Sequence, residues 1–241
     1  MFEWLPEFAL GHTECASLDA SDAVLKLRKI ANNIYNTDKF ERRGEFGELL
    51  LHILLRQVFG TIPAISKMFY KDSHNDTVKG FDAVHVVHSP TENALELWLG
   101  EVKFYENITA AIAAVLKELG EHTDAEYLKG EFAAITNKID PAWPHSGQLT
   151  KLLHPNTSLD EVFKRACIPV LLTYDSDTLA AFNASSAAFT KALNAEYKAL
   201  HKSFADKLKC QVKVHLFLLP MSTKKALLAA LDERLKAWQK L

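Results

Sequence analysis

Cysteine is scarce in this sequence, with three residues among 241. Cys15, Cys167 and Cys210 are far apart and odd in number. They therefore lack the close spacing of a zinc site and the even count of a disulfide framework. The sequence predicts a protein of a reducing compartment, in which the cysteines are structural.

Long apolar runs are also missing. No stretch approaches the roughly 18 consecutive apolar residues of a membrane-spanning helix. The first residues, Met1–Pro6, lack the basic region and the apolar region of a secretion signal. We therefore expect a cytoplasmic protein that has no membrane span.

The chain carries almost no net charge. Lys and Arg total 28, Asp and Glu total 30, and the formal net charge is −2. Proteins that hold nucleic acid by bulk electrostatics are usually more basic. Arg42 and Arg43 could meet a phosphodiester backbone, although a solvated charge pair is the simpler interpretation. Binding of nucleic acid would thus depend on a local basic surface or on a partner protein.

Several catalytic motifs are absent. The sequence has no Walker A loop, no G-x-S-x-G turn, no H-E-x-x-H helix and no C-x-x-C pair. These absences exclude the usual signatures of P-loop nucleotide binding, α/β-hydrolase chemistry, zinc proteolysis and dithiol redox chemistry.

Two strand-like runs carry the most informative residues. Asp82 belongs to Phe81–Val87, and the triplet Glu101-Val102-Lys103 closes Ala94–Phe104, nineteen residues later. Both runs are rich in β-branched and aromatic residues, and the polar segment Ser89–Asn93 separates them. This pattern predicts a β-hairpin with a short polar loop.

Strand geometry places Glu101 and Lys103 side by side at the end of an apolar row, because side chains alternate between the two faces of a strand. An acid or an amine buried there without a partner would be costly. With Asp82 on the neighbouring strand, two carboxylates can hold a divalent cation while the lysine faces a phosphate or a water. The alternative is a surface salt bridge on the hairpin.

A strong amphipathic helix is predicted from Glu45 to Phe59, with Gly60 ending it. Glu45 and His52 fall on its polar side, whereas Glu48 borders the apolar arc. An acid at that border could face a site at the sheet. Alternatively, a Glu near a helix N-terminus is stabilised by the helix dipole by ~0.3–1 kcal/mol. The pattern favours the dipole interpretation for Glu45 and leaves both open for Glu48.

The remaining pattern predicts an α/β fold, in which helices flank both faces of a mixed β-sheet. Residues 1–20 are expected to be irregular, as a short lead strand or an arm against another element, and 36–43 to be a linker. The chain then divides into an N-terminal segment, 1–43, and a larger domain, 44–241. Further helices are expected over 21–35, 107–119, 124–139, 158–166, 177–208 and 222–238, a long turn over 140–147, and further strands over 63–71, 168–174 and 212–219.

The arrangement of Asp82 and Glu101-Val102-Lys103 resembles the PD-(D/E)XK nuclease superfamily, in which an Asp on one strand precedes Glu-x-Lys on the next. Gly80-Phe81 stands where that superfamily often has Pro. A narrower resemblance runs from Gly44 to the C-terminus, through G-E-x-G-E, K-G-x-D, L-G-E-V-K-F-Y, an Ala-rich helix and a strand ending L-L-P. This order is similar to the HamA family, the nuclease subunits of the Hachiman anti-phage defence system.

The resemblance implies a restriction-endonuclease-like core and a metal-dependent DNase that works with a superfamily 2 helicase. Asp82 and Glu101, with the Val102 carbonyl, would hold one or two Mg²⁺ ions, or Mn²⁺ in their place. Lys103 would position the attacking water or stabilise charge on the phosphate. Glu48 would bind a second metal ion or fix a water, and residues 1–43 would contact the partner.

Two other functions remain compatible with the sequence. A nuclease fold can lose its chemistry and persist as a module that binds nucleic acid or protein, although the presence of Asp82, Glu101 and Lys103 argues against such decay. An RNA-directed nuclease is the other alternative, because nothing in the sequence separates DNA from RNA.

Overall fold

A computed structural model describes residues 1–19, 21–34, 44–66 and 80–241. The predicted linker over 36–43, with Arg42 and Arg43, lies outside these residues, as does the predicted strand from residue 67 onward.

Among the described residues, five strands form one mixed sheet in the order β1-β2-β3-β4-β5. The strands are β1 (Ile62–Pro63), β2 (Ala83–Ser89), β3 (Ala94–Phe104), β4 (Ala166–Asp175) and β5 (Lys213–Met221). The pairs β1–β2 and β2–β3 are antiparallel, whereas β3–β4 and β4–β5 are parallel. The predicted hairpin and the predicted mixed sheet are both confirmed.

The last residues of β3 extend beyond the first residue of the antiparallel strand β2. The register pairs Ser89 with Ala94 and Ala83 with Gly100, and β2 begins at Ala83. On the other side of β3, β4 pairs with residues as far along as Phe104. The segment from Glu101 to Phe104 therefore pairs with β4 on one edge and is not paired with β2 on the other edge.

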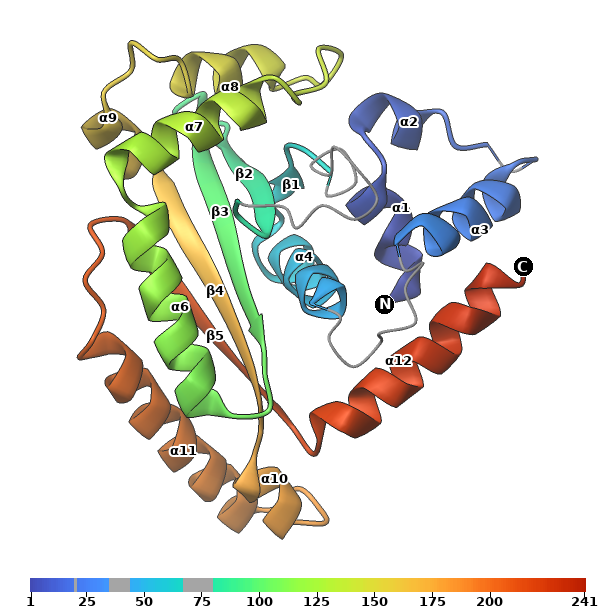
Figure 1. Cartoon of the computed structure of the whole chain (residues 1–241), viewed down its shortest axis with the longest axis vertical. Helices are drawn as coiled ribbons and strands as arrows, with labels where there is room; N and C mark the ends of the chain where they lie inside the picture. The colour runs from blue at the N-terminus through green and yellow to red at the C-terminus, as the bar shows by residue number, and fades with distance from the viewer. Residues whose placement is uncertain (20, 35–43, 67–79) are drawn as a thin grey trace.

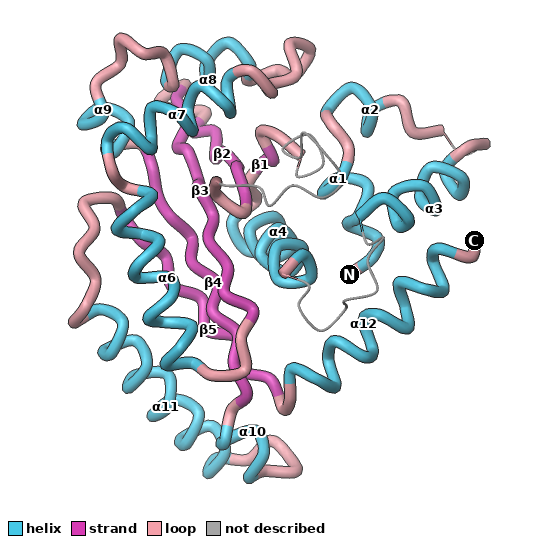
Figure 2. Tube along the Cα trace, viewed as in Figure 1, coloured by secondary structure: helices cyan, strands magenta, loops and turns pink. Residues whose placement is uncertain are grey.

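Helices cover both faces of the sheet (Figure 1; Figure 2). In these views α6, α7 and α11 lie on one side and α1, α3, α4 and α12 lie on the other. The fold class predicted from the sequence is confirmed. The bounds are η1 (Phe2–Trp4), α1 (Leu5–Ala9), α2 (His12–Ala16), α3 (Ala23–Ile34), α4 (Glu45–Phe59), α6 (Ile108–His122), α7 (Ala125–Thr136), α8 (Ser146–Leu152), α9 (Leu159–Lys164), α10 (Asp177–Ala181), α11 (Ala187–Ala205) and α12 (Lys224–Gln239).

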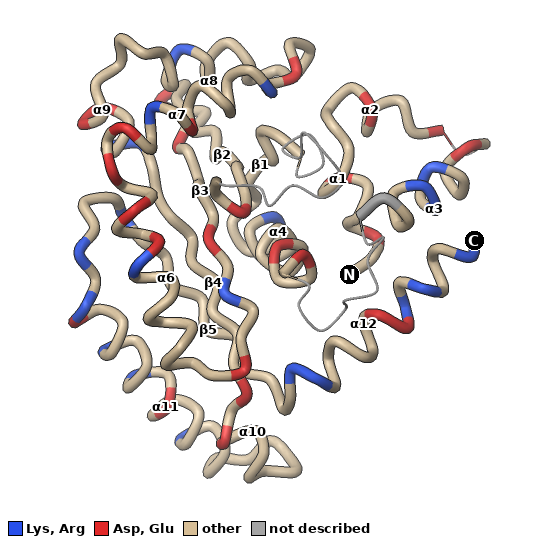
Figure 3. Tube along the Cα trace, in the orientation of Figure 1, with Lys and Arg blue, Asp and Glu red and all other residues tan. Residues whose placement is uncertain are grey.

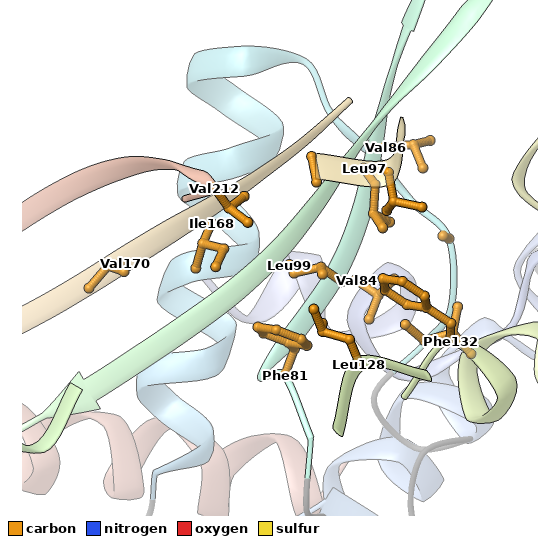
Figure 4. Packing of buried hydrophobic residues seen from close by; sticks show 14 of the residues in the cluster. Phe81, Val84, Val86, Leu97, Leu99, Leu128, Phe132, Ile168, Val170 and Val212 are labelled. Atoms are coloured by element: carbon orange, nitrogen blue, oxygen red, sulfur yellow. The ribbon is translucent and has the colours of Figure 1, made fainter. Parts of the chain in front are cut away.

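Two apolar cores lie on opposite faces of the sheet. Alternation along β3 divides its side chains between them: Leu97 and Leu99 enter the core beneath α6 and α7, whereas Trp98 and Val102 enter the core beneath α4 and α12. Figure 4 shows the first core, in which Leu128 from α7 lies beside strand residues. This division decides which helices meet the charged end of β3.

The crossover helix α6 continues one turn beyond the predicted end at residue 119. Asn107 caps its N-terminus by accepting a hydrogen bond from the Ala110 N–H at 2.9 Å. The helix ends at His122, and Asp124 caps α7 immediately afterwards. The extra turn brings Glu121 and His122 into the helix.

The prediction that residues 1–20 are irregular is wrong, since η1, α1 and α2 form there. Phe2 packs on Trp238 of α12 with ring centroids 6.0 Å apart. Glu7 of α1 pairs with Arg56 at 2.8 Å and with His52 at 3.1 Å. His52, predicted on the polar side of α4, is consequently buried, because the N-terminal helices cover that side.

Boundaries at α8 and β5 also differ from the prediction. The long turn predicted over 140–147 ends at residue 145, because α8 begins at Ser146. β5 continues past Pro220 to Met221 instead of ending at the proline. Pro is tolerated there because β5 is an edge strand of the described sheet, where a missing N–H need not break a ladder.

Candidate active site

Asp82 lies immediately before β2 and beside Glu101 of β3. Its backbone N–H donates to the Gly100 carbonyl at 2.8 Å, and its Oδ2 accepts from the Val102 N–H at 2.8 Å. The carboxylate therefore supplies the hydrogen-bond partner of β3 at the point where β2 begins. This bond fixes Asp82 against the Glu101-Val102-Lys103 segment.

Glu101 and Lys103 share the face of β3 that carries Leu97 and Leu99, as the alternation predicted. Their exposed fractions are 1% and 8%. The alternative interpretation of a surface salt bridge on the hairpin is therefore wrong. Two charged groups at these depths must be compensated by partners within the protein.

The partners come from α6 and lie four residues apart on it. Glu118 forms an ion pair with the Lys103 ammonium, and His122 Nδ1 lies 2.5 Å from Glu101 Oε1. The imidazole of His122 stacks on the Tyr127 ring, with ring centroids 4.5 Å apart, and makes a T-shaped contact with the Phe81 ring, with centroids 5.2 Å apart. The strand residues and α6 thus form one charged cluster between the sheet and the helices.

The electrostatics of this cluster are governed by burial and by the neighbouring carboxylates. Burial is the main cause that raises the pKa of Glu101 to about 7; the hydrogen bond with His122 opposes this rise, and the Asp82 charge contributes to it. Burial lowers the pKa of Lys103, but Glu118, Asp82 and Glu101 together hold it above its ordinary value. The site therefore favours the ammonium form of the lysine. An added cation would reduce the repulsion between the Asp82 and Glu101 carboxylates.

The α7 side of the cluster requires a glycine. Gly80 has a φ of 151°, and a Cβ there would lie 2.7 Å from the Glu131 carboxylate. Glu131 is itself buried, with an exposed fraction of 8%. A residue with a side chain at position 80 would be strained and would collide with Glu131, which accounts for the glycine two residues before Asp82.

Glu48 belongs to the helix on the opposite face of the sheet. Its neighbour Gly47 lies so close to β3 that a Cβ would meet Val102 Cγ1 at 2.7 Å and Phe104 Cβ at 3.0 Å. Val102 and Phe104 point away from the face that carries Glu101 and Lys103. The structure brings Asp82, Glu101 and Lys103 together and places Glu48, half-buried, on the helix behind the strand.

A family model for HamA matches residues 1–235 of the 241-residue chain. The chain belongs to the HamA family. HamA is associated with Hachiman defence against phage. No curated protein matches the chain. None of the described helices is both long enough and apolar enough to cross a membrane.

The oxygen donors of this site fit a magnesium ion that keeps waters among its ligands better than they fit a metal ion held by protein side chains alone. Among residues 1–19, 21–34, 44–66 and 80–241, no three His, Cys, Asp or Glu side chains are grouped to hold a metal. Mg²⁺, however, is usually bound through one or two carboxylates and keeps waters or substrate phosphates as its other ligands. Asp82 and Glu101 supply that number, and the Asp82 charge adds to the rise that burial produces in the pKa of Glu101.

The α6 and α7 residues of this site were not predicted from the sequence. Glu118 and His122 have the four-residue spacing that places two side chains on one helix face. The helix was predicted to end near residue 119, however, so His122 fell outside it. The buried cluster also includes Tyr127, whose pKa is raised by burial and by the carboxylates around it.

Proposed function

We propose that this HamA-family chain is a metal-dependent nuclease that hydrolyses DNA phosphodiester bonds in Hachiman defence, in concert with a helicase. The observation that carries the proposal is that Glu101 and Lys103 lie buried on one face of β3, while the half-buried Asp82 accepts from the Val102 N–H at the edge where β2 begins. Two carboxylates and one ammonium at that edge match the needs of phosphodiester hydrolysis.

Asp82 and Glu101 are the proposed ligands of Mg²⁺ or Mn²⁺. The Val102 N–H points toward Asp82, and the N–H and C=O groups of one residue in an extended strand point to the same side. The Val102 carbonyl is therefore directed toward the same edge as a further oxygen donor. A divalent cation bound there lowers the pKa of a water and polarises the scissile phosphate.

Lys103 is the proposed phosphate-facing group. Its raised pKa keeps it protonated at neutral pH, so it can stabilise negative charge that grows on the phosphate or orient the attacking water. Neither role requires a proton to leave the lysine. The buried setting strengthens its electrostatic effect, since the surroundings are less polarisable than water.

Metal binding provides the most direct test. Asp82→Asn keeps an acceptor for the Val102 N–H but removes the charge, so we expect it to weaken Mg²⁺ or Mn²⁺ binding at least tenfold in calorimetry. Asp206→Asn is the matched control, because Asp206 is an exposed residue that pairs with Lys202 after α11. Circular plasmid should be cut with Mg²⁺ and not with a chelator, by the chain alone or with its co-purified partner.

Equal metal binding by the parent protein, Asp82→Asn and Asp206→Asn would contradict the proposed ligands. Metal binding without cleavage of any nucleic acid would favour a catalytically silent binding module. Cleavage of RNA and not of plasmid would assign the chemistry to the other nucleic acid.

Glu48 is proposed as a supporting acid that would bind a second metal ion or fix a metal-bound water. We expect Glu48→Ala to lower the rate of plasmid cutting far more than Glu45→Ala, which serves as the matched control in the same helical turn. Rates should be measured beside thermal unfolding of both variants. Equal rates, or a loss for Glu48→Ala that only follows its lower melting temperature, would restore the helix-dipole interpretation.

A further inference from the structure

Helix α6 directs two side chains, one helical turn apart, at the two charged residues near the end of β3, Glu101 and Lys103. Glu118 contacts the Lys103 ammonium and His122 contacts the Glu101 carboxylate. The parallel β3–β4 connection places α6 over this face of the sheet, where its apolar residues share a core with Leu97 and Leu99 of β3. The spacing of 118 and 122 along the helix thus matches the spacing of 103 and 101 along the strand.

The ion pair with Glu118 restricts the flexibility of the Lys103 side chain. A lysine ammonium is carried on a four-carbon stem with many rotamers, and it acts as a point charge only where something holds it. Glu118 is about one-third exposed, whereas the Lys103 side chain is one-tenth exposed. The ion pair therefore reaches from the surface of α6 into the buried end of β3 and fixes the ammonium next to Asp82 and Glu101.

The contact with His122 restricts the orientation of the Glu101 carboxylate. A carboxylate that accepts a hydrogen bond on one oxygen presents the other in a defined direction, and such outer partners typically change metal affinity by 10–100-fold. The imidazole itself stacks on the Tyr127 ring and makes a T-shaped contact with the Phe81 ring. His122 therefore has little freedom to leave Oε1 of Glu101.

We infer that Glu118 and His122 are positioning residues of this site: Glu118 places the Lys103 ammonium for the phosphate, and His122 aims the free oxygen of Glu101 at the metal ion. The inference rests on the proposed function of Asp82, Glu101 and Lys103. It assigns α6 a part in the chemistry beyond closing the core over the sheet.

The experiment separates metal binding from turnover in the full chain with its co-purified partner. His122→Leu is expected to weaken Mn²⁺ binding in calorimetry about tenfold or more. His122→Asn should restore most of the affinity, because the Asn amide can replace the Nδ1–H donor. Glu118→Gln is expected to leave Mn²⁺ binding near the parent value while lowering kcat by about tenfold or more, with a smaller change in KM.

Glu121→Gln is the matched control, since Glu121 lies on the exposed face of α6 and pairs with Lys117. Suppose that Lys103→Met abolishes cutting, as the proposed function requires. Metal binding by His122→Leu at the parent level, or a kcat of Glu118→Gln at the parent level, would then overturn this inference and leave the proposed function standing. Faster cutting by either variant would also overturn it, because α6 would then restrain the site. Absence of cutting by the parent protein under every metal and partner condition would overturn both the inference and the proposed function.

Discussion

Replacing Glu101 with glutamine, or Lys103 with methionine, is expected to reduce plasmid cutting by about 100-fold or more while the fold survives. Removal of one group that stabilises the transition state commonly has an effect of that order. Both substitutions nearly preserve side-chain volume, which matters because the two residues are 1% and 8% exposed. Alanine at either position would add a cavity to the loss of charge.

The two variants should fail for different reasons. Glu101→Gln removes a metal ligand, so Mn²⁺ affinity should fall together with the cutting rate. Lys103→Met removes the phosphate-facing cation and leaves both carboxylates, so metal affinity should stay close to that of the parent protein. The measurements are the initial rate of plasmid cutting and calorimetric Mn²⁺ binding on the same preparations.

Glu96→Gln is the control for this experiment. Glu96 lies on the same strand, away from the site, and pairs with Lys213 at 3.6 Å on the surface. Its rate should match that of the parent protein, and circular dichroism should show that all three variants are folded. Unchanged cutting by both Glu101→Gln and Lys103→Met would sink the assignment of the active site.

The isolated chain is expected to bind duplex DNA only weakly, with a Kd on the order of 10⁻⁶ M or above at physiological salt, as for non-specific binding. The formal net charge is −2, and Figure 3 shows Lys and Arg interspersed with Asp and Glu along the helices. Each phosphate that a protein neutralises adds about −0.9 to the slope of log K against log salt. A chain with few clustered Lys and Arg side chains should bind duplex DNA weakly and show a shallow slope of log K against log salt.

Stable binding should appear only when a second subunit, proposed to be a helicase, brings DNA to the site. The measurement is fluorescence anisotropy of a labelled duplex over a salt series, with the isolated chain and with the complex. Glu101→Gln should be used in both arms, because a duplex that is cut during the titration cannot report affinity. Tight binding by the isolated chain, with a steep salt slope, would point instead to a self-sufficient nuclease.

The sequence by itself determined the hairpin and the shared face of its charged residues. Alternation of side chains is a local property of a strand, so the positions of Glu101 and Lys103 followed from their spacing alone. The polar loop between the two runs then set Asp82 beside them. Long crossovers between the later strands likewise favoured a mixed sheet with helices on both faces, and the structure has that fold.

Only the tertiary structure decided which groups meet these strand residues from other elements. Glu118 and His122 reach the site because α6 packs over one face of β3, while α4 packs over the other and carries Glu48 behind the strand. His52 is buried because the N-terminal helices cover α4. Which face a helix covers depends on how the chain crosses the sheet and which distant segments complete the core, and neither is encoded in the spacing of residues along one element.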